Sequence, residues 1–153
     1  MEGPNFNAES YRASAVEAIT AAQVLYNASA FGKSLYLSGL AVECMLRAYR
    51  MRINPMFSSR HDLVELQKES GITAALDEVD GKAFSDALAV VRAAWRNAHR
   101  FASDAAISRF LKQVRLDRGI KGSFLKEIAR RTYNAALRIV AIGERAWTVS
   151  NKK

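Results

Sequence analysis

Apolar side chains recur at every third or fourth position over long stretches of this 153-residue chain, and proline occurs only at positions 4 and 55. Because this spacing gathers apolar side chains on one face of an α-helix, we expect long amphipathic helices and no β-sheet. Half of the residues are hydrophobic, enough for one buried core in a chain too short for two ordinary domains. The sequence therefore predicts a single all-α domain over residues 1–153, an antiparallel bundle of four to five helices with a flexible tail at about 150–153.

Turn and capping residues divide the chain into segments. Gly32 is expected to end a first helix over about residues 8–30, and Asn54-Pro55 to end a second over 34–53, because proline cannot continue the helical hydrogen bonds. A short helix is expected from about 61 to Gly71. Further helices are expected over about 82–102, from the cap Ser103-Asp104 until glycines at 119 and 122, and over 124–149.

Positive charge is concentrated in the last third of the chain. Residues 1–104 contain eleven lysines and arginines against twelve acidic residues, whereas residues 105–153 contain twelve against three. Such a surface attracts polyanions such as RNA through long-range electrostatics and counterion release. The alternative is a solvated basic face that only keeps the protein in solution.

The chain contains few residues that could bind a cofactor, hold a metal or form a disulfide. Cys44 is the only cysteine and lies in an apolar helical run, so an internal disulfide is excluded and a small core side chain is expected. The two histidines form no zinc pattern with it. Gly32-Lys33-Ser34 resembles the end of a phosphate-binding loop, but the first glycine of that motif is replaced by Asn27. We expect no cofactor, no metal, no membrane span and a cytoplasmic location.

Three sequence elements occur in a characteristic order. Residues 37–48 read LSGLAVECMLRA, an apolar helix with Glu43 followed four positions later by Arg47. Residues 60–63 read RHDL and are followed by Leu66, and four residues separate Trp95 from Arg100-Phe101. Together these elements resemble the signature of the HEPN family (higher eukaryotes and prokaryotes nucleotide-binding). The similarity covers roughly residues 35–103, while the flanking helices match only in length and pattern.

The resemblance implies an antiparallel helical bundle that often forms homodimers. Proteins of this family are commonly RNA-cleaving toxins of toxin–antitoxin pairs, antiviral defence proteins, or partners of minimal nucleotidyltransferases. Many HEPN nucleases carry an arginine followed, after four to six residues, by a histidine, and Arg92 and His99 have this spacing. The active form of the motif usually has a polar residue directly after the arginine, where this chain has Ala93.

The chemistry expected of these residues is metal-independent cleavage of RNA. Seven positions are nearly two helical turns, which would place Arg92 and His99 on one helix face with Arg96 between them. Histidine titrates near neutral pH and can accept the ribose 2′-hydroxyl proton, while arginines stabilise the charge that develops on phosphate. We therefore take His99 as the candidate for proton transfer, with Arg92 and Arg96 as candidate phosphate ligands.

Glu43 needs a partner if it points into the core, as its apolar neighbours indicate. Arg100 and Arg92 are candidates, and Arg47 lies one helical turn away. A structural salt bridge and a catalytic role that tunes His99 both remain open, with Arg47 and Arg100 as further phosphate-binding candidates. His61 is expected to dock a loop at a helix start, with a catalytic role as the less favoured alternative. Trp95, Trp147 and Tyr133 lie on apolar stripes and are expected in the core rather than as base-stacking platforms.

Three functional hypotheses follow. The first is a dimeric HEPN-type ribonuclease or toxin-like RNA-binding effector with Arg92, His99 and Glu43 at its catalytic centre. The second is a non-catalytic module that binds a nucleotide or phosphate ligand, or that partners a nucleotidyltransferase antitoxin. The third is a structural homodimer whose charged cleft holds helices in register.

Overall fold

The computed structural model describes residues 6–56 and 61–150, and within them the chain is all-helical, without strands. Six α-helices and two short 3₁₀ segments follow one another. They are α1 (Ala8–Asn27), α2 (Phe31–Ile53), α3 (Leu63–Ser70), η1 (Ile72–Ala75), α4 (Glu78–Ala94), η2 (Asn97–Phe101), α5 (Asp104–Gln113) and α6 (Phe124–Ser150). The expected all-α helical bundle is confirmed, although the described residues form six α-helices rather than four to five.

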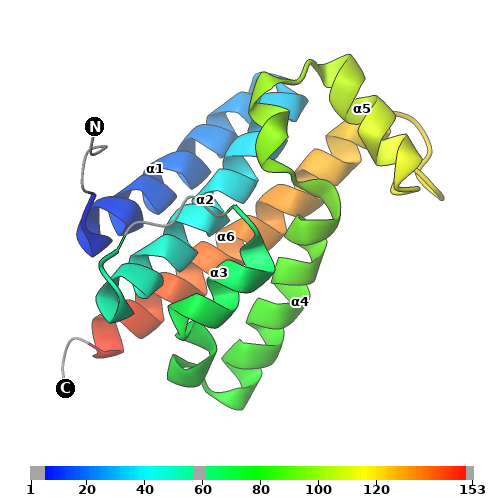
Figure 1. Ribbon diagram of the computed structural model, residues 1–153. Coiled ribbons are helices and arrows are strands. Elements are labelled where there is room, and N and C mark those ends of the chain that lie inside the picture. Colours follow the sequence, from blue (N-terminus) through cyan, green and yellow to red (C-terminus); the bar gives the residue numbers. More distant parts are fainter. Residues whose placement is uncertain (1–5, 57–60, 151–153) are drawn as a thin grey trace.

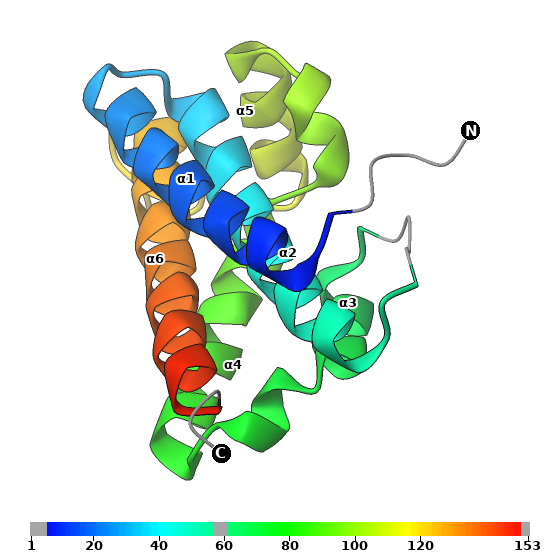
Figure 2. The same ribbon diagram turned by 90° about the vertical axis from the view of Figure 1, so that its left-hand side faces the viewer.

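Helix α2 lies at the centre of the bundle and contacts α1, α3, α5, α6 and η2. Helices α1 and α2 form an antiparallel pair, and α6 runs beside α2 in the same direction (Figure 1). Helix α4 packs against α6 and runs in the opposite direction. Helix α3 packs on α2 near the carboxyl end of α2 (Figures 1 and 2). Every residue from Ala41 to Arg50 of α2 is buried, so any function carried by that stretch depends on what surrounds it.

One cluster of buried apolar side chains draws residues from all six α-helices. Trp95 and Trp147 are buried in it as expected, and Tyr133 packs against it partly buried. No helix within residues 6–56 and 61–150 is long and apolar enough to cross a membrane. Cys44 is buried, and burial with nearby Glu43 raises the pKa of its thiol to about 12, which rules it out as a nucleophile near neutral pH.

Several local signals act as expected. The carboxylate of Asp62 accepts hydrogen bonds from the backbone N–H groups of Val64 and Glu65, and Gly71 ends α3 in the left-handed region at φ +64°. The Ser103 hydroxyl accepts from Ala106 N–H at the start of α5. The residues at 151–153 of the expected tail lie outside the described part of the chain.

Several predicted boundaries are wrong. Helix α5 ends at Gln113, six residues before Gly119, and α4 begins at Glu78 rather than at about 82. Helix α1 ends at Asn27, and Gly32 lies inside α2 rather than between the helices. The helix expected over 82–102 stops at Ala94, because Trp95 and Arg96 are extended (ψ 140° and 143°) before η2 begins. The Trp95 indole N–H donates to the carbonyl of Tyr36 at 3.0 Å, so this tertiary contact accompanies the break.

Candidate functional site

A cleft of about 300 Å³ opens where the start of α3 faces the end of α4. Its walls combine two loop residues before α3, the last turn of α4 and the extended segment that follows. The lining residues are His61, Asp62, Leu63, Arg92, Trp95, Arg96 and Asn97. The cleft therefore brings together two of the predicted residues, Arg92 and Arg96, and adds His61.

A buried carboxylate holds His61 at the mouth of the cleft. Glu43 Oε1 lies 2.5 Å from His61 Nδ1 and 3.2 Å from Arg47 Nη2. The Glu43 side chain is only 3% exposed, whereas that of His61 is 44% exposed. A carboxylate against Nδ1 favours the tautomer in which Nδ1 carries the proton and Nε2 is free to accept one. The histidine is thus oriented from the core and remains accessible from solvent.

Arg50 bonds to residues on both sides of His61 along the chain. Its Nε donates to Glu69 Oε2 on α3 at 2.7 Å, and its Nη1 donates to the carbonyl of Met56 at 2.6 Å. Arg50 is buried, and hydrogen bonds to a charged donor strengthen where water is excluded. These bonds tie the end of α2 to α3, and Asp62 caps α3 directly after His61.

The two arginines of the cleft are held differently. Arg96 Nη1 donates to the carbonyls of Arg92 and Trp95, each at 2.7 Å, and its guanidinium lies 5.0 Å from the ring centre of Phe110. Arg92 is exposed in the last turn of α4. No hydrogen bond or ion pair from its side chain to another described residue is found. Arg96 is therefore fixed in place, whereas Arg92 is available to a ligand.

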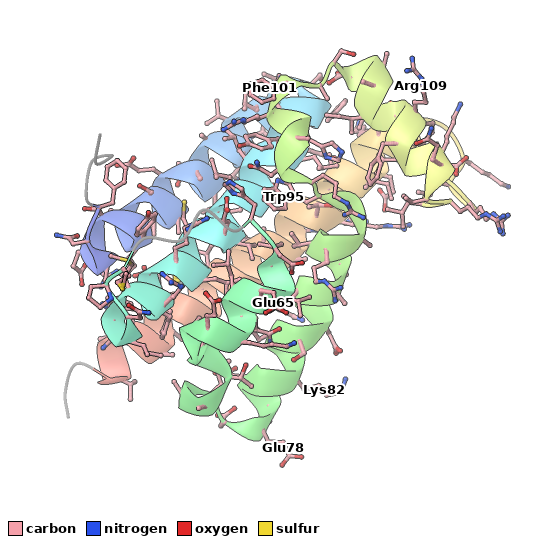
Figure 3. The ribbon with its side chains drawn as sticks, in the orientation of Figure 1. Glu65, Glu78, Lys82, Trp95, Phe101 and Arg109 are labelled. Atoms are coloured by element: carbon pink, nitrogen blue, oxygen red, sulfur yellow. The ribbon has the colours of Figure 1, made fainter. Side chains whose placement is uncertain are left out.

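Trp95 lines the cleft beside these arginines and contacts α2. Its ring stacks on Tyr36 with centroids 6.3 Å apart, and a Cβ added at Gly39 would overlap the indole. The position of Trp95 near the middle of the bundle is visible in Figure 3. Glycine at position 39 therefore allows α2 and the extended segment after α4 to approach closely.

The structure does not place His99 in the cleft. Because α4 ends at Ala94, Arg92 and His99 do not share a helix face, and that geometric expectation is wrong. His99 is buried in η2, where Nδ1 accepts the Arg96 backbone N–H at 3.2 Å and the ring packs edge-on against Phe110. Burial, and then the charge of Arg96, lowers its pKa. In its neutral form, His99 therefore caps the start of η2.

The remaining predicted phosphate-binding residues, Arg47 and Arg100, do not line the cleft. Arg47 is buried beside Glu43, the only expected partner of that carboxylate that the structure confirms among the described residues. Arg100 is exposed, and its guanidinium lies over Phe101 rather than beside Glu43. Among the described residues, Glu43 forms no ion pair with Arg100 or Arg92.

Sequence reasoning misses two neighbours of Glu43. It assigns His61 to loop docking, although an RHDL segment near an acidic helix is a usable signal. Tyr36 lies seven residues before Glu43 on α2, half-buried, and nothing in its position distinguishes it. Burial and the charge of Glu43 raise the pKa of Tyr36, while Arg100 opposes this, so its hydroxyl stays protonated.

Comparisons with protein-family models, with curated proteins and with solved structures found no match. Within the described residues, no group of three or more histidine, cysteine or acidic side chains is placed to hold a metal ion. The cleft lining supplies one oriented imidazole, two guanidinium groups, the Asp62 carboxylate and the Asn97 amide, and the buried Glu43 carboxylate lies behind the imidazole.

Proposed function

We propose that this chain is a HEPN-type RNA-cleaving effector whose phosphate-binding and proton-transfer groups lie in the His61–Arg92–Arg96 cleft. The observation that carries the proposal is the Glu43–His61 pair, a buried carboxylate against an accessible imidazole. The order of the sequence elements and the basic last third of the chain support RNA as the substrate. A toxin-like role, a cytoplasmic location and a homodimeric state belong to the same proposal.

The proposed reaction is transesterification within RNA. His61 Nε2 accepts the proton of a ribose 2′-hydroxyl, and the 2′-oxygen bonds to the adjacent phosphorus while the bond to the 5′-oxygen of the next nucleotide breaks. Arg92 and Arg96 stabilise the charge that builds on the phosphoryl oxygens. Glu43 stabilises the imidazolium that forms, as a carboxylate does behind a catalytic histidine. The leaving 5′-oxygen takes a proton from water or from the imidazolium.

A second candidate function is a non-catalytic module that binds RNA, a nucleotide or another phosphate ligand in the same cleft. The observation that favours it is that the described lining contains a single histidine. Proton transfer contributes most when both the attacking and the leaving oxygen have a positioned group. Binding needs only the arginines. In this alternative the module acts with a partner such as a nucleotidyltransferase encoded elsewhere.

Cleavage of a mixed RNA by the purified protein in the presence of a chelator tests the first proposal. We expect His61→Ala to lower the cleavage rate by about 10²- to 10⁴-fold, the usual contribution of a proton-transfer group. His99→Asn keeps an acceptor for Arg96 N–H and should retain cleavage. Lys82→Ala removes one charge from α4 about 15 Å from Arg92 along the helix and serves as the matched control.

Two results would change the assignment. Full cleavage by His61→Ala together with loss in His99→Asn would return the catalytic role to His99. RNA that stays intact with the wild type, yet binds it with an affinity that Arg92→Ala weakens, would favour the binding module. RNA that neither binds nor is cut would overturn both candidate functions.

A further inference from the structure

Phe101 is the most solvent-exposed of the large hydrophobic residues in η2 and α5, with 78% of its surface accessible. It is the last residue of η2, and Figure 3 places it near the end of the molecule where that segment leads into α5. The guanidinium of Arg100 lies 4.4 Å from the centre of its ring. A phenyl ring in this position offers an apolar face to water and has a cation beside it.

The backbone around Phe101 is held from α2. Lys33 Nζ donates to the carbonyl of Arg100 at 3.4 Å and to that of Ala102 at 3.2 Å. His99, two residues earlier, is anchored by its hydrogen bond with Arg96 and its contact with Phe110. The exposed ring is therefore presented by a fixed segment on both sides, which lowers the entropic cost of using it to bind a ligand.

Phe101 lies close to the cleft along the chain. Asn97, which begins η2, lines the cleft. Phe101 follows four residues later, and a 3₁₀ helix rises about 2 Å per residue, so the two positions are about 8 Å apart along the segment. A nucleotide adjoining one whose phosphate contacts Arg92 and Arg96 can reach this ring.

We infer that Phe101 and Arg100 form a platform beside the cleft on which an unpaired base of bound RNA stacks. This inference rests on the proposed function and adds a binding residue outside the cleft to it. Aromatic side chains stack on the faces of unpaired bases, and arginine adds a cation–π contribution. In a duplex the base faces are already covered by their neighbours, so only an unpaired base can use this ring.

The other aromatic residues near the cleft are occupied. Trp95 is buried against Tyr36, and Phe110 is covered by His99 and Arg96. Phe101 contacts only Arg100 among the ring interactions found for it in the described part of the chain. Since the neighbouring rings are packed within the protein, Phe101 is the position at which base stacking can be tested without removing a core side chain.

The test measures binding of the full chain to a fluorescent 12-nucleotide RNA whose 2′-hydroxyls are methylated, so that it cannot be cut by 2′-attack. A duplex of the same length is the second probe. Phe101→Leu keeps an apolar side chain but removes the flat ring, whereas Phe101→Trp keeps one. We expect Phe101→Leu to weaken single-strand binding about tenfold, as loss of one stacked base does, with Phe101→Trp close to wild type and duplex binding unchanged.

The controls separate the possible failures. Phe101→Leu that binds single strands as wild type does, while Arg92→Ala weakens binding, would overturn the platform and leave the proposed function standing. Absence of binding to both probes by the wild type, with no cleavage, would overturn both. Phe101→Leu that dissociates a dimer without changing RNA affinity of the remaining species would show that the ring docks on a second copy, and would overturn the platform. An unchanged melting temperature of Phe101→Leu confirms that the fold is intact.

Discussion

Glu43 is a carboxylate placed in a stretch of α2 where all ten residues from 41 to 50 are buried. Transfer of an ionised side chain into such a position costs several kcal/mol unless charges and hydrogen bonds compensate it. Arg47 and His61 supply that compensation from two directions. An apolar residue would fill the same space without this requirement, so in the proposed function the value of Glu43 lies in orienting the imidazole.

The two histidines differ in their surroundings, and His99 gives a test by pH. The ordinary histidine pKa is 6.5, and burial with the charge of Arg96 lowers it in the folded chain. The unfolded chain therefore takes up this proton at a higher pH than the folded chain. The stabilising contribution of neutral His99 is complete above pH 6.5 and is lost as the pH falls through its folded pKa.

His99→Asn removes this titration while an amide oxygen can still accept the Arg96 N–H. We expect the free energy of unfolding, measured by urea denaturation, to fall less between pH 7.5 and pH 5.5 in His99→Asn than in the wild type. His61 is present in both proteins, so its effect cancels in the comparison. Equal decreases in the two proteins would show that His99 is not held neutral by the fold.

At the scale of elements, the turn between α1 and α2 carries strain that a single substitution can relieve. Ser29 adopts φ +63° while its N–H donates to Tyr26 O at 2.9 Å, and Ala30 N–H donates to Leu25 O at 2.8 Å. This is the position where helices usually end with glycine. The left-handed conformation costs a residue with Cβ roughly 1–2 kcal/mol, and glycine gives back part of that gain as entropy of the unfolded chain.

We therefore expect Ser29→Gly to raise the free energy of unfolding by about 0.5–1 kcal/mol in urea denaturation. Ser29→Ala keeps the Cβ and should stay near wild type, which makes it the matched control. A glycine variant no more stable than the alanine variant would mean that the turn relaxes in solution.

The element boundaries also show what the sequence can and cannot predict. Asn54-Pro55, Asp62, Gly71 and Ser103 act through their own backbone or the next few residues, so their effects are predicted correctly. The break at Trp95 is not, since its indole bonds to Tyr36, 59 residues away. A continuous periodic pattern gives no sign of this tertiary contact.

The candidate site is predictable in part for the same reason. The spacing along the sequence singles out Arg92 and Arg96, and both line the cleft. Glu43 is expected to need a partner, but which partner it finds depends on how α3 docks on α2, which Arg50 and Glu69 determine. The two histidines therefore differ from the expectation. His61, expected to dock a loop, lines the cleft, whereas His99, expected to transfer protons, is buried outside it.

At the scale of the whole molecule, four of the twelve lysines and arginines of the last third line a second hollow of about 450 Å³ at the start of α6. Glu127 there lies 2.6 Å from Arg130 and 3.0 Å from Arg131. These hydrogen bonds lower the pKa of Glu127 to about 2, so it remains ionised and offsets part of the charge of the two arginines. Lys121 and Lys126, which line the same hollow, have no such neighbour in the described salt bridges.

If this basic end guides RNA towards the cleft, its contribution is electrostatic and independent of sequence. Removing one lysine that touches a phosphate lowers the slope of log K against log salt by about one. We expect the double variant Lys121→Ala with Lys126→Ala to weaken binding of all RNA sequences alike and to reduce the slope by up to about two, whereas Glu127→Gln should steepen it. Lys82 lies near the start of α4, away from the end of that helix that borders the cleft (Figure 3). Lys82→Ala should therefore leave the slope unchanged. A double variant with the wild-type slope would mean that these lysines are only a solvated face, because a surface that touches no phosphate releases no counterions.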